Sequence, residues 1–253
     1  GLYAAIICAA LACPLGLLAQ ELDLPARAAD ALSGSEFAQV IDGLELDARD
    51  ERIVSEILGG NVPRWLRSLR PVPIEAVGVG SVTIWVAPDY LAVGSDADYL
   101  LVPLAPGTAQ RIADELEMSL PTPAMVDAIW RAASIKLEPE PIPPSSEMTT
   151  VRVFLRHSAT LRLQREVWEV GDRLVAGHKK DVVVTAALNE RRDRVAIYGW
   201  HEPDGTPIQP LYLGHDDTWV DYSHGIRLVS RVIEVDGQEM DLWDALRSPD
   251  LAT

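Results

Sequence analysis

All five histidines of the chain lie between His157 and His224, and four of them flank one segment of the C-terminal third: His178, His201, His215 and His224. Imidazole is the side chain whose unperturbed pKa lies closest to neutral pH, and it is also the commonest neutral metal ligand. These positions therefore predict a functional site that works by proton transfer or by metal coordination.

The densest part of this region runs from Asp221 to Arg227. It contains a carboxylate, a phenol, a hydroxyl, an imidazole and a guanidinium. In such a cluster His224 could move a proton, and Arg227 could hold a carboxylate through two hydrogen bonds. The predicted catalytic residues are His201, Asp221, Ser223, His224 and Arg227. The alternative is a buried polar network that fixes a loop.

A metal site is a further possibility, because histidines and carboxylates that meet in the fold could hold zinc or another divalent cation. The predicted ligands are His178, Asp181, His215 and His224. Neither a His-Glu-x-x-His nor a His-x-His spacing occurs, so the ligands would come from separate segments.

Four residues near the histidines are predicted to contact a substrate: Lys179, Trp200, Tyr222 and Gln209. Lys179 could meet an anionic group, although a charged strand edge that discourages aggregation has the same pattern. Trp200 follows Gly199 at the end of an expected strand, where ligand contacts are common. Gln209 lies between two prolines and could either contact a ligand or fix the loop, and we favour the loop.

The segments 197–201 and 223–228 resemble the catalytic domain of the L,D-transpeptidase (YkuD-type) family. In that family a strand ending in histidine precedes a Ser-His-Gly-Cys motif and an Ile/Val-Arg-Leu run. The resemblance implies a β-rich domain acting on peptidoglycan stem peptides, with His201, His224 and Arg227 at the family's two histidine positions and its arginine position. Ile226 follows Gly225 where the family has its cysteine, so the thiolate chemistry does not carry over. The chain also resembles a family of secreted bacterial proteins in its segments 60–63, 120–122 and 221–225.

Residues 2–18 form an uncharged apolar run, followed by the small residue Ala19. This pattern predicts a signal peptide over residues 1–19, a secreted or periplasmic protein, and no stable membrane span after cleavage. Cys8 and Cys13 both lie in this run, so the mature chain would contain no cysteine. A lipid anchor at Cys13 is the less favoured alternative.

The chain has 38 acidic and 22 basic residues, and its formal net charge is −16. Such a field repels nucleic acid, so we expect none as a partner. Helical spacing of apolar residues is found over 33–58, 108–118 and 123–135, and strand-like patterns over 74–93 and 99–102.

The segment 138–147 is rich in proline and is predicted to be a linker or a strap. Beyond it, strands are expected at 151–155, 161–163, 181–185, 194–198, 226–229 and 231–235. The predicted fold is α+β, with a mixed helical and strand portion over 20–137 and a β-rich portion carrying the site over 148–253.

These observations favour a hydrolase of the cell envelope that acts on a peptidoglycan peptide or a related amide or ester. One alternative is a non-catalytic protein that binds an envelope glycan or peptide, because several aromatic residues lie near the histidines. The other is a degenerate L,D-transpeptidase-like domain.

Overall fold

The computed structural model describes residues 20–76 and 80–248, and the predicted signal peptide with Cys8 and Cys13 lies outside this part. The largest sheet has the strand order β14-β13-β2-β12-β5, with β1 paired to β2. Its strands are β1 (Arg70–Ala76), β2 (Gly80–Val86), β5 (Met118–Ser119), β12 (Val229–Ser230), β13 (Val232–Val235) and β14 (Gln238–Asp241).

A second sheet has the order β10-β9-β8-β11 and carries five of the predicted site residues: Asp181, Trp200, His201, Gln209 and His224. Its strands are β8 (Lys180–Val182), β9 (Ile197–His201), β10 (Pro207–Tyr212) and β11 (His224–Gly225). Strand β11 is parallel to β8, whereas β8, β9 and β10 pair antiparallel. Two smaller pairs are β3 (Ala92–Gly94) with β4 (Tyr99–Leu101), and β6 (Ile135–Lys136) with β7 (Val175–Ala176).

The helices begin where the sequence supplies good N-terminal residues. Ser33 and Glu36 form a reciprocal capping box, and Thr122 caps the helix that starts at Pro123. The helices are α1 (Gly34–Ile41), α2 (Leu46–Leu58), α3 (Arg64–Arg67), α4 (Pro106–Glu115), α5 (Pro123–Ala132), α6 (Val151–Val167) and α7 (Leu242–Arg247), with short 3₁₀ helices η1 (Ser146–Thr149) and η2 (Ala186–Glu190). The helices predicted within 33–58, 108–118 and 123–135 are thereby confirmed.

The strands predicted at 151–155 and 161–163 are wrong, because both segments belong to the single helix α6. Its buried residues include Val151, Phe154, Ser158, Leu161 and Arg165, which recur at intervals of three and four. That is the spacing of one helix face. Ser158 and Arg165 are polar, so a pattern based on apolar residues alone missed the face.

The proline-rich segment is a strap that lies on the body of the protein. The backbone NH of Glu138 donates to Gln164 of α6, and the NH of Ile142 donates to the Tyr222 hydroxyl at 2.7 Å. The two portions predicted on either side of this segment share one sheet, because β12 and β13 both pair with β2. They also share the main apolar core, which extends from Leu22 to Leu228.

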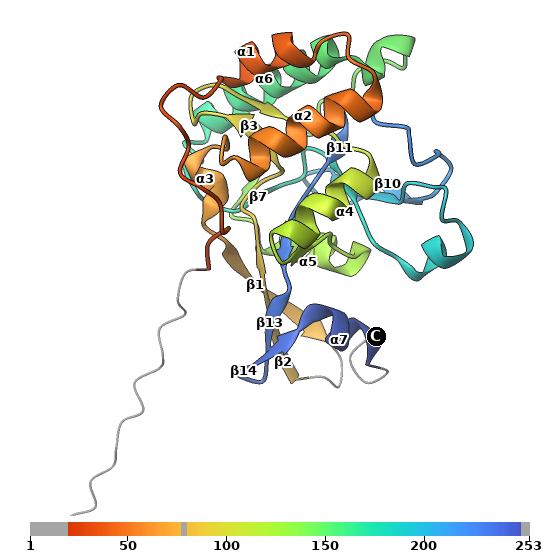
Figure 1. Ribbon diagram of the computed structural model, residues 1–253. Coiled ribbons are helices and arrows are strands. Elements are labelled where there is room, and N and C mark those ends of the chain that lie inside the picture. Colours follow the sequence, from red (N-terminus) through yellow and green to blue (C-terminus); the bar gives the residue numbers. More distant parts are fainter. Residues whose placement is uncertain (1–19, 77–79, 249–253) are drawn as a thin grey trace, which may run out of the picture.

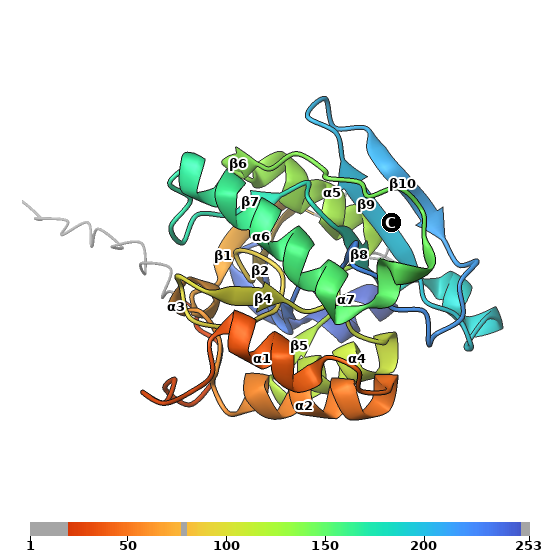
Figure 2. The same ribbon diagram turned by 90° about the horizontal axis from the view of Figure 1, so that it is seen from above.

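The arrangement is α+β, as predicted. Figure 1 shows α1, α2 and α6 gathered at one end of the molecule, with β1, β2, β13, β14 and α7 at the other. Figure 2 shows β9 and β10 side by side at the edge away from α1 and α2. None of the helices in the described ranges is long and apolar enough to cross a membrane.

Candidate functional site

The pairing of β8 with its neighbours decides which site residues share a face. Lys180 lies opposite Gly199 of β9 and opposite His224 of β11. Register partners on adjacent strands project to the same side of a sheet, and residues one position away project to the other. Lys180 and His224 therefore share one face. Asp181 and its partner Gly225 belong to the opposite face.

Asp221 organises the turn that leads into β11. Its Oδ1 accepts from the Ser223 backbone NH at 2.7 Å and from the Ser223 hydroxyl at 2.5 Å, while its Oδ2 accepts from Trp219 Nε1 at 3.0 Å. Burial alone would raise the pKa of Asp221. The interaction with His224 and the hydrogen bonds from Ser223 outweigh that effect and lower the pKa to about 2. Asp221 is therefore a carboxylate at neutral pH.

His224 lies beside this carboxylate, with Nε2 3.8 Å from Asp221 Oδ2, which is too long for a hydrogen bond. The residue is 1% exposed, and neither ring nitrogen hydrogen-bonds with any residue that the structure describes. Burial lowers the pKa of His224 to about 4, although Asp221 opposes the shift. The imidazole is thus neutral at pH 7 and can accept a proton.

Lys179 and Tyr222 form the inner side of the site. The Lys179 ammonium donates to the Tyr222 carbonyl oxygen, and burial lowers the pKa of Lys179 to about 7. The edge of the Tyr222 ring packs against His157 of α6, with 4.8 Å between ring centroids. The Tyr222 hydroxyl binds the strap at Ile142. Tyr222 therefore connects the site, α6 and the strap.

The outer side of the site is lined by aromatic rings. His215 stacks on Trp219 at a centroid distance of 5.0 Å, and Tyr212 packs edge-on against His215 at 5.2 Å. Tyr212 is 42% exposed, and His215 and Trp219 are half-buried. Because Trp219 also donates to Asp221, this aromatic rim leads from the surface to the Asp221 turn.

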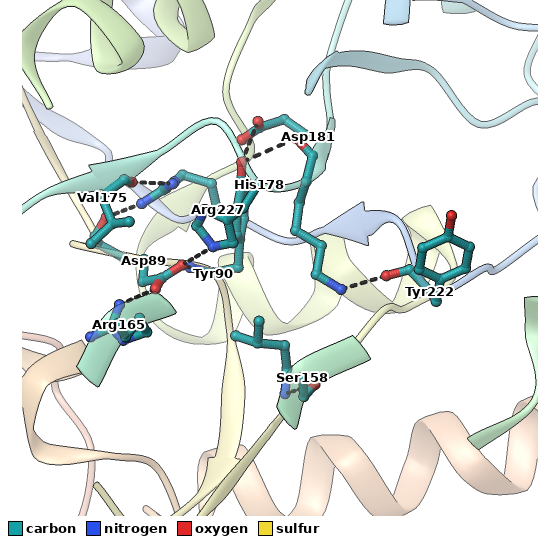
Figure 3. Close-up of polar contacts among 12 residues, drawn as sticks. Asp89, Tyr90, Ser158, Arg165, Val175, His178, Asp181, Tyr222 and Arg227 are labelled. Atoms are coloured by element: carbon teal, nitrogen blue, oxygen red, sulfur yellow. Dashed lines mark hydrogen bonds and ion pairs between the residues drawn. The ribbon is translucent and has the colours of Figure 1, made fainter. Parts of the chain in front are cut away.

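A second polar network lies deeper, centred on Asp89 (Figure 3). The Asp89 carboxylate is fully buried, pairs with Arg165 of α6, and lies 3.0 Å from His178 Nε2. Burial would raise its pKa, but the interactions with His178 and Arg165 hold it well below its usual value. The next residue, Tyr90, donates its hydroxyl to Asp181 at 2.8 Å. This network joins the loop after β2 to α6 and β8.

His201 lies apart from the Asp221 turn, in a cluster with α5. Its Nε2 is 3.1 Å from Asp127 Oδ1, which also accepts from the Tyr198 hydroxyl at 2.9 Å. The ring stacks on Trp130 at a centroid distance of 5.6 Å. Burial lowers the pKa of His201, and Asp127 opposes the shift.

Three predicted roles need correction. Arg227 does not present its guanidinium to a substrate, because Nη1 and Nη2 donate to the carbonyls of Ala87 and Val175 while the group lies 4.3 Å over the Tyr90 ring. The Ser223 hydroxyl donates to Asp221, so Ser223 fixes the turn and is not positioned as a nucleophile. Gln209 lies half-buried in strand β10 and not in a loop, and its amide donates to the carbonyl of the adjacent Pro210.

The predicted metal ligands do not come together. His178 pairs with Asp89, Asp181 with Tyr90, and His224 lies beside Asp221, while His215 stacks between aromatic rings. Within residues 20–76 and 80–248, no group of three or more His, Cys, Asp or Glu side chains is placed to hold a metal ion.

The sequence prediction missed Asp89 and Asp127, which pair with His178 and His201. It also missed Arg165, which pairs with Asp89, and the contact of His157 with Tyr222. Asp89 stands in an otherwise apolar segment between Val86 and Leu91, which is a sequence signal for a buried and paired carboxylate. Asp127 and Arg165 lie on helices 74 and 76 residues from their partners, and nothing in the local sequence indicates those pairings.

No family model, no curated protein and no solved structure matches this chain. The partial resemblance to the L,D-transpeptidase motif therefore stays a prediction. Any function proposed for this chain therefore rests on the geometry of the site.

Proposed function

We propose that this chain is a secreted hydrolase of the cell envelope, which cleaves an amide or ester bond in a peptidoglycan peptide or a related molecule, with His224 as the general base. The observation that carries the proposal is the His224–Asp221 pair. A neutral imidazole with both nitrogens free of described partners lies beside a carboxylate whose orientation is fixed by Ser223 and Trp219.

Each group has a definite part in the proposed reaction. His224 takes a proton from a water molecule, and the water oxygen attacks the carbonyl carbon of the substrate. The nearby Asp221 carboxylate stabilises the imidazolium that forms. When the carbon–nitrogen or carbon–oxygen bond breaks, the imidazolium returns its proton to the leaving group. The product is a free carboxylate and an amine or alcohol, and His224 is neutral again.

The aromatic rim supports an approach of the substrate to the Asp221 turn from the side of Trp219. Tyr212, His215 and Trp219 form a run of aromatic surface that ends at Asp221. Aromatic faces of this kind suit sugar rings and the apolar parts of peptides.

The test is the release of new amine or carboxylate groups from purified peptidoglycan and from its soluble peptide fragments, followed by mass spectrometry. The variant His224→Gln should reduce kcat/KM by about 100- to 10,000-fold, the usual contribution of a general base. His157→Gln is the matched control, because His157 is also a buried histidine but does not contact Asp221. Wild-type protein that releases nothing, or two variants with equal activity, would overturn the proposal. A parallel assay with a chelator tests the zinc alternative.

The second candidate is a non-catalytic binding protein for an envelope glycan or peptide. The observation that favours it is the partly exposed aromatic rim itself. Retention of the protein on insoluble peptidoglycan without any release of product would support it over the hydrolase.

A further inference from the structure

Lys180 is an unusual cation for its position. It is half-buried, and burial lowers its pKa. Its ammonium has no carboxylate oxygen within 4 Å in the described part of the chain, and the charge of nearby Asp221 only partly opposes the effect of burial on its pKa. A partly desolvated ammonium that makes no direct ion pair is costly, and an anion that contacts it would reduce that cost.

The neighbour of Lys180 is Trp200, which adds a second donor. Lys180 Nζ lies 5.1 Å from the centre of the Trp200 ring, and Trp200 Nε1 is buried without a described hydrogen-bond partner. Trp200 also has a φ of 56°, in a region that bulky residues rarely adopt. Lysine ammonium and indole NH can only donate hydrogen bonds. A ligand that satisfies both must bring acceptors, as a carboxylate does.

The register of β8 and β11 relates this pair to the proposed base. Lys180 and His224 are direct partners on adjacent parallel strands, so they project from the same face. Adjacent strands lie about 4.8 Å apart. One extended residue spans about 3.5 Å, so a carboxylate one residue beyond a bond held at His224 falls within reach of the flexible Lys180 side chain.

We infer that Lys180 and Trp200 form a carboxylate subsite, and that the substrate is a peptide cleaved next to its free C-terminal residue. This inference rests on the proposed function for the cleavage step. The binding preference for a free carboxylate follows from the donor pair alone.

The test compares one peptide in two forms, with a free C-terminal carboxylate and with a C-terminal amide. Binding is measured by calorimetry in the His224→Gln variant, so that turnover does not enter the result. The free acid should bind about 10- to 100-fold more tightly than the amide, as expected for a charge-assisted hydrogen bond. Lys180→Gln in the same background should abolish that preference and leave binding of the amide unchanged.

Lys136→Gln is the matched control, because Lys136 Nζ also lies over a tryptophan ring, 4.6 Å from the centre of Trp130. It should keep the full preference for the free acid. Equal binding of acid and amide, or a preference that persists in Lys180→Gln, would overturn the subsite. If the preference is present but wild-type protein cleaves neither peptide, the hydrolase proposal fails and the subsite stands. If both peptides are cleaved equally well, the subsite fails and the hydrolase proposal stands.

Discussion

Asp181→Asn is expected to stabilise the protein at neutral and alkaline pH. Asp181 is 3% exposed, and burial raises its pKa to about 7, although Arg227 and the Tyr90 hydroxyl oppose the shift. In the unfolded chain the same carboxyl has a pKa of about 3.9. The folded state therefore holds a proton that the unfolded state releases. Stability is lost as the pH rises from about 4 to about 7.

The size of this effect follows from the two pKa values. A difference of about 3 pKa units corresponds to about 4 kcal/mol, at about 1.4 kcal/mol per unit. Asparagine cannot ionise and still offers an oxygen to the Tyr90 hydroxyl, so the variant avoids this loss. The gain over wild type should be near zero at pH 4 and should approach about 4 kcal/mol above pH 7, as an upper bound.

Urea denaturation at several pH values between 4 and 8 measures the difference directly. The free energy of unfolding of the variant is compared with that of wild type at each pH, because titration of His224 changes the stability of both proteins in the opposite direction to Asp181. The pKa of His224 is lowered to about 4, so its contribution to stability is gained as the pH rises from about 4 to about 6.5. Asp217→Asn is the control, since Asp217 is exposed. A gain for Asp181→Asn that is the same at pH 4 and pH 8 would refute the reasoning.

Two further predictions concern the residues that hold the site in place. Asp89→Asn should destabilise the protein by about 3–5 kcal/mol in chemical denaturation, because it leaves the Arg165 charge buried without its partner; a loss below about 1 kcal/mol would contradict this. Tyr222→Phe removes the hydroxyl that accepts from the Ile142 NH, so hydrogen exchange at that amide should become faster at a cost of about 1 kcal/mol, and an unchanged exchange rate would show that the strap is held elsewhere.

The elements with strong local signals were predictable from sequence. The capped helices α1 and α5 and the hairpin strand β13 follow from caps, apolar spacing and turn residues. Helix α6 was not predicted, because Ser158 and Arg165 interrupt its apolar face. The Ser158 hydroxyl accepts from the Leu101 backbone NH, and Arg165 donates to Asp89. Both partners are distant in sequence, so these buried polar positions could not be expected from the local pattern.

The site was predictable in location and only partly in role. The Asp221–His224 turn was identified correctly as a polar cluster, since its hydrogen bonds are local in sequence. The prediction that the histidines share one metal site was wrong, because each imidazole ring contacts a different residue. Asp89 lies 89 residues before His178, and Asp127 lies 74 residues before His201. Pairings over such separations leave no periodic trace in a single sequence.

The pairing of both β12 and β13 with β2 has a consequence for how the chain can fold. The segments before and after the strap each supply strands that the other needs as hydrogen-bonding neighbours. Neither segment is therefore expected to fold as a self-sufficient module. The site, although it is carried mainly by the last third of the chain, therefore depends on strands that precede the strap.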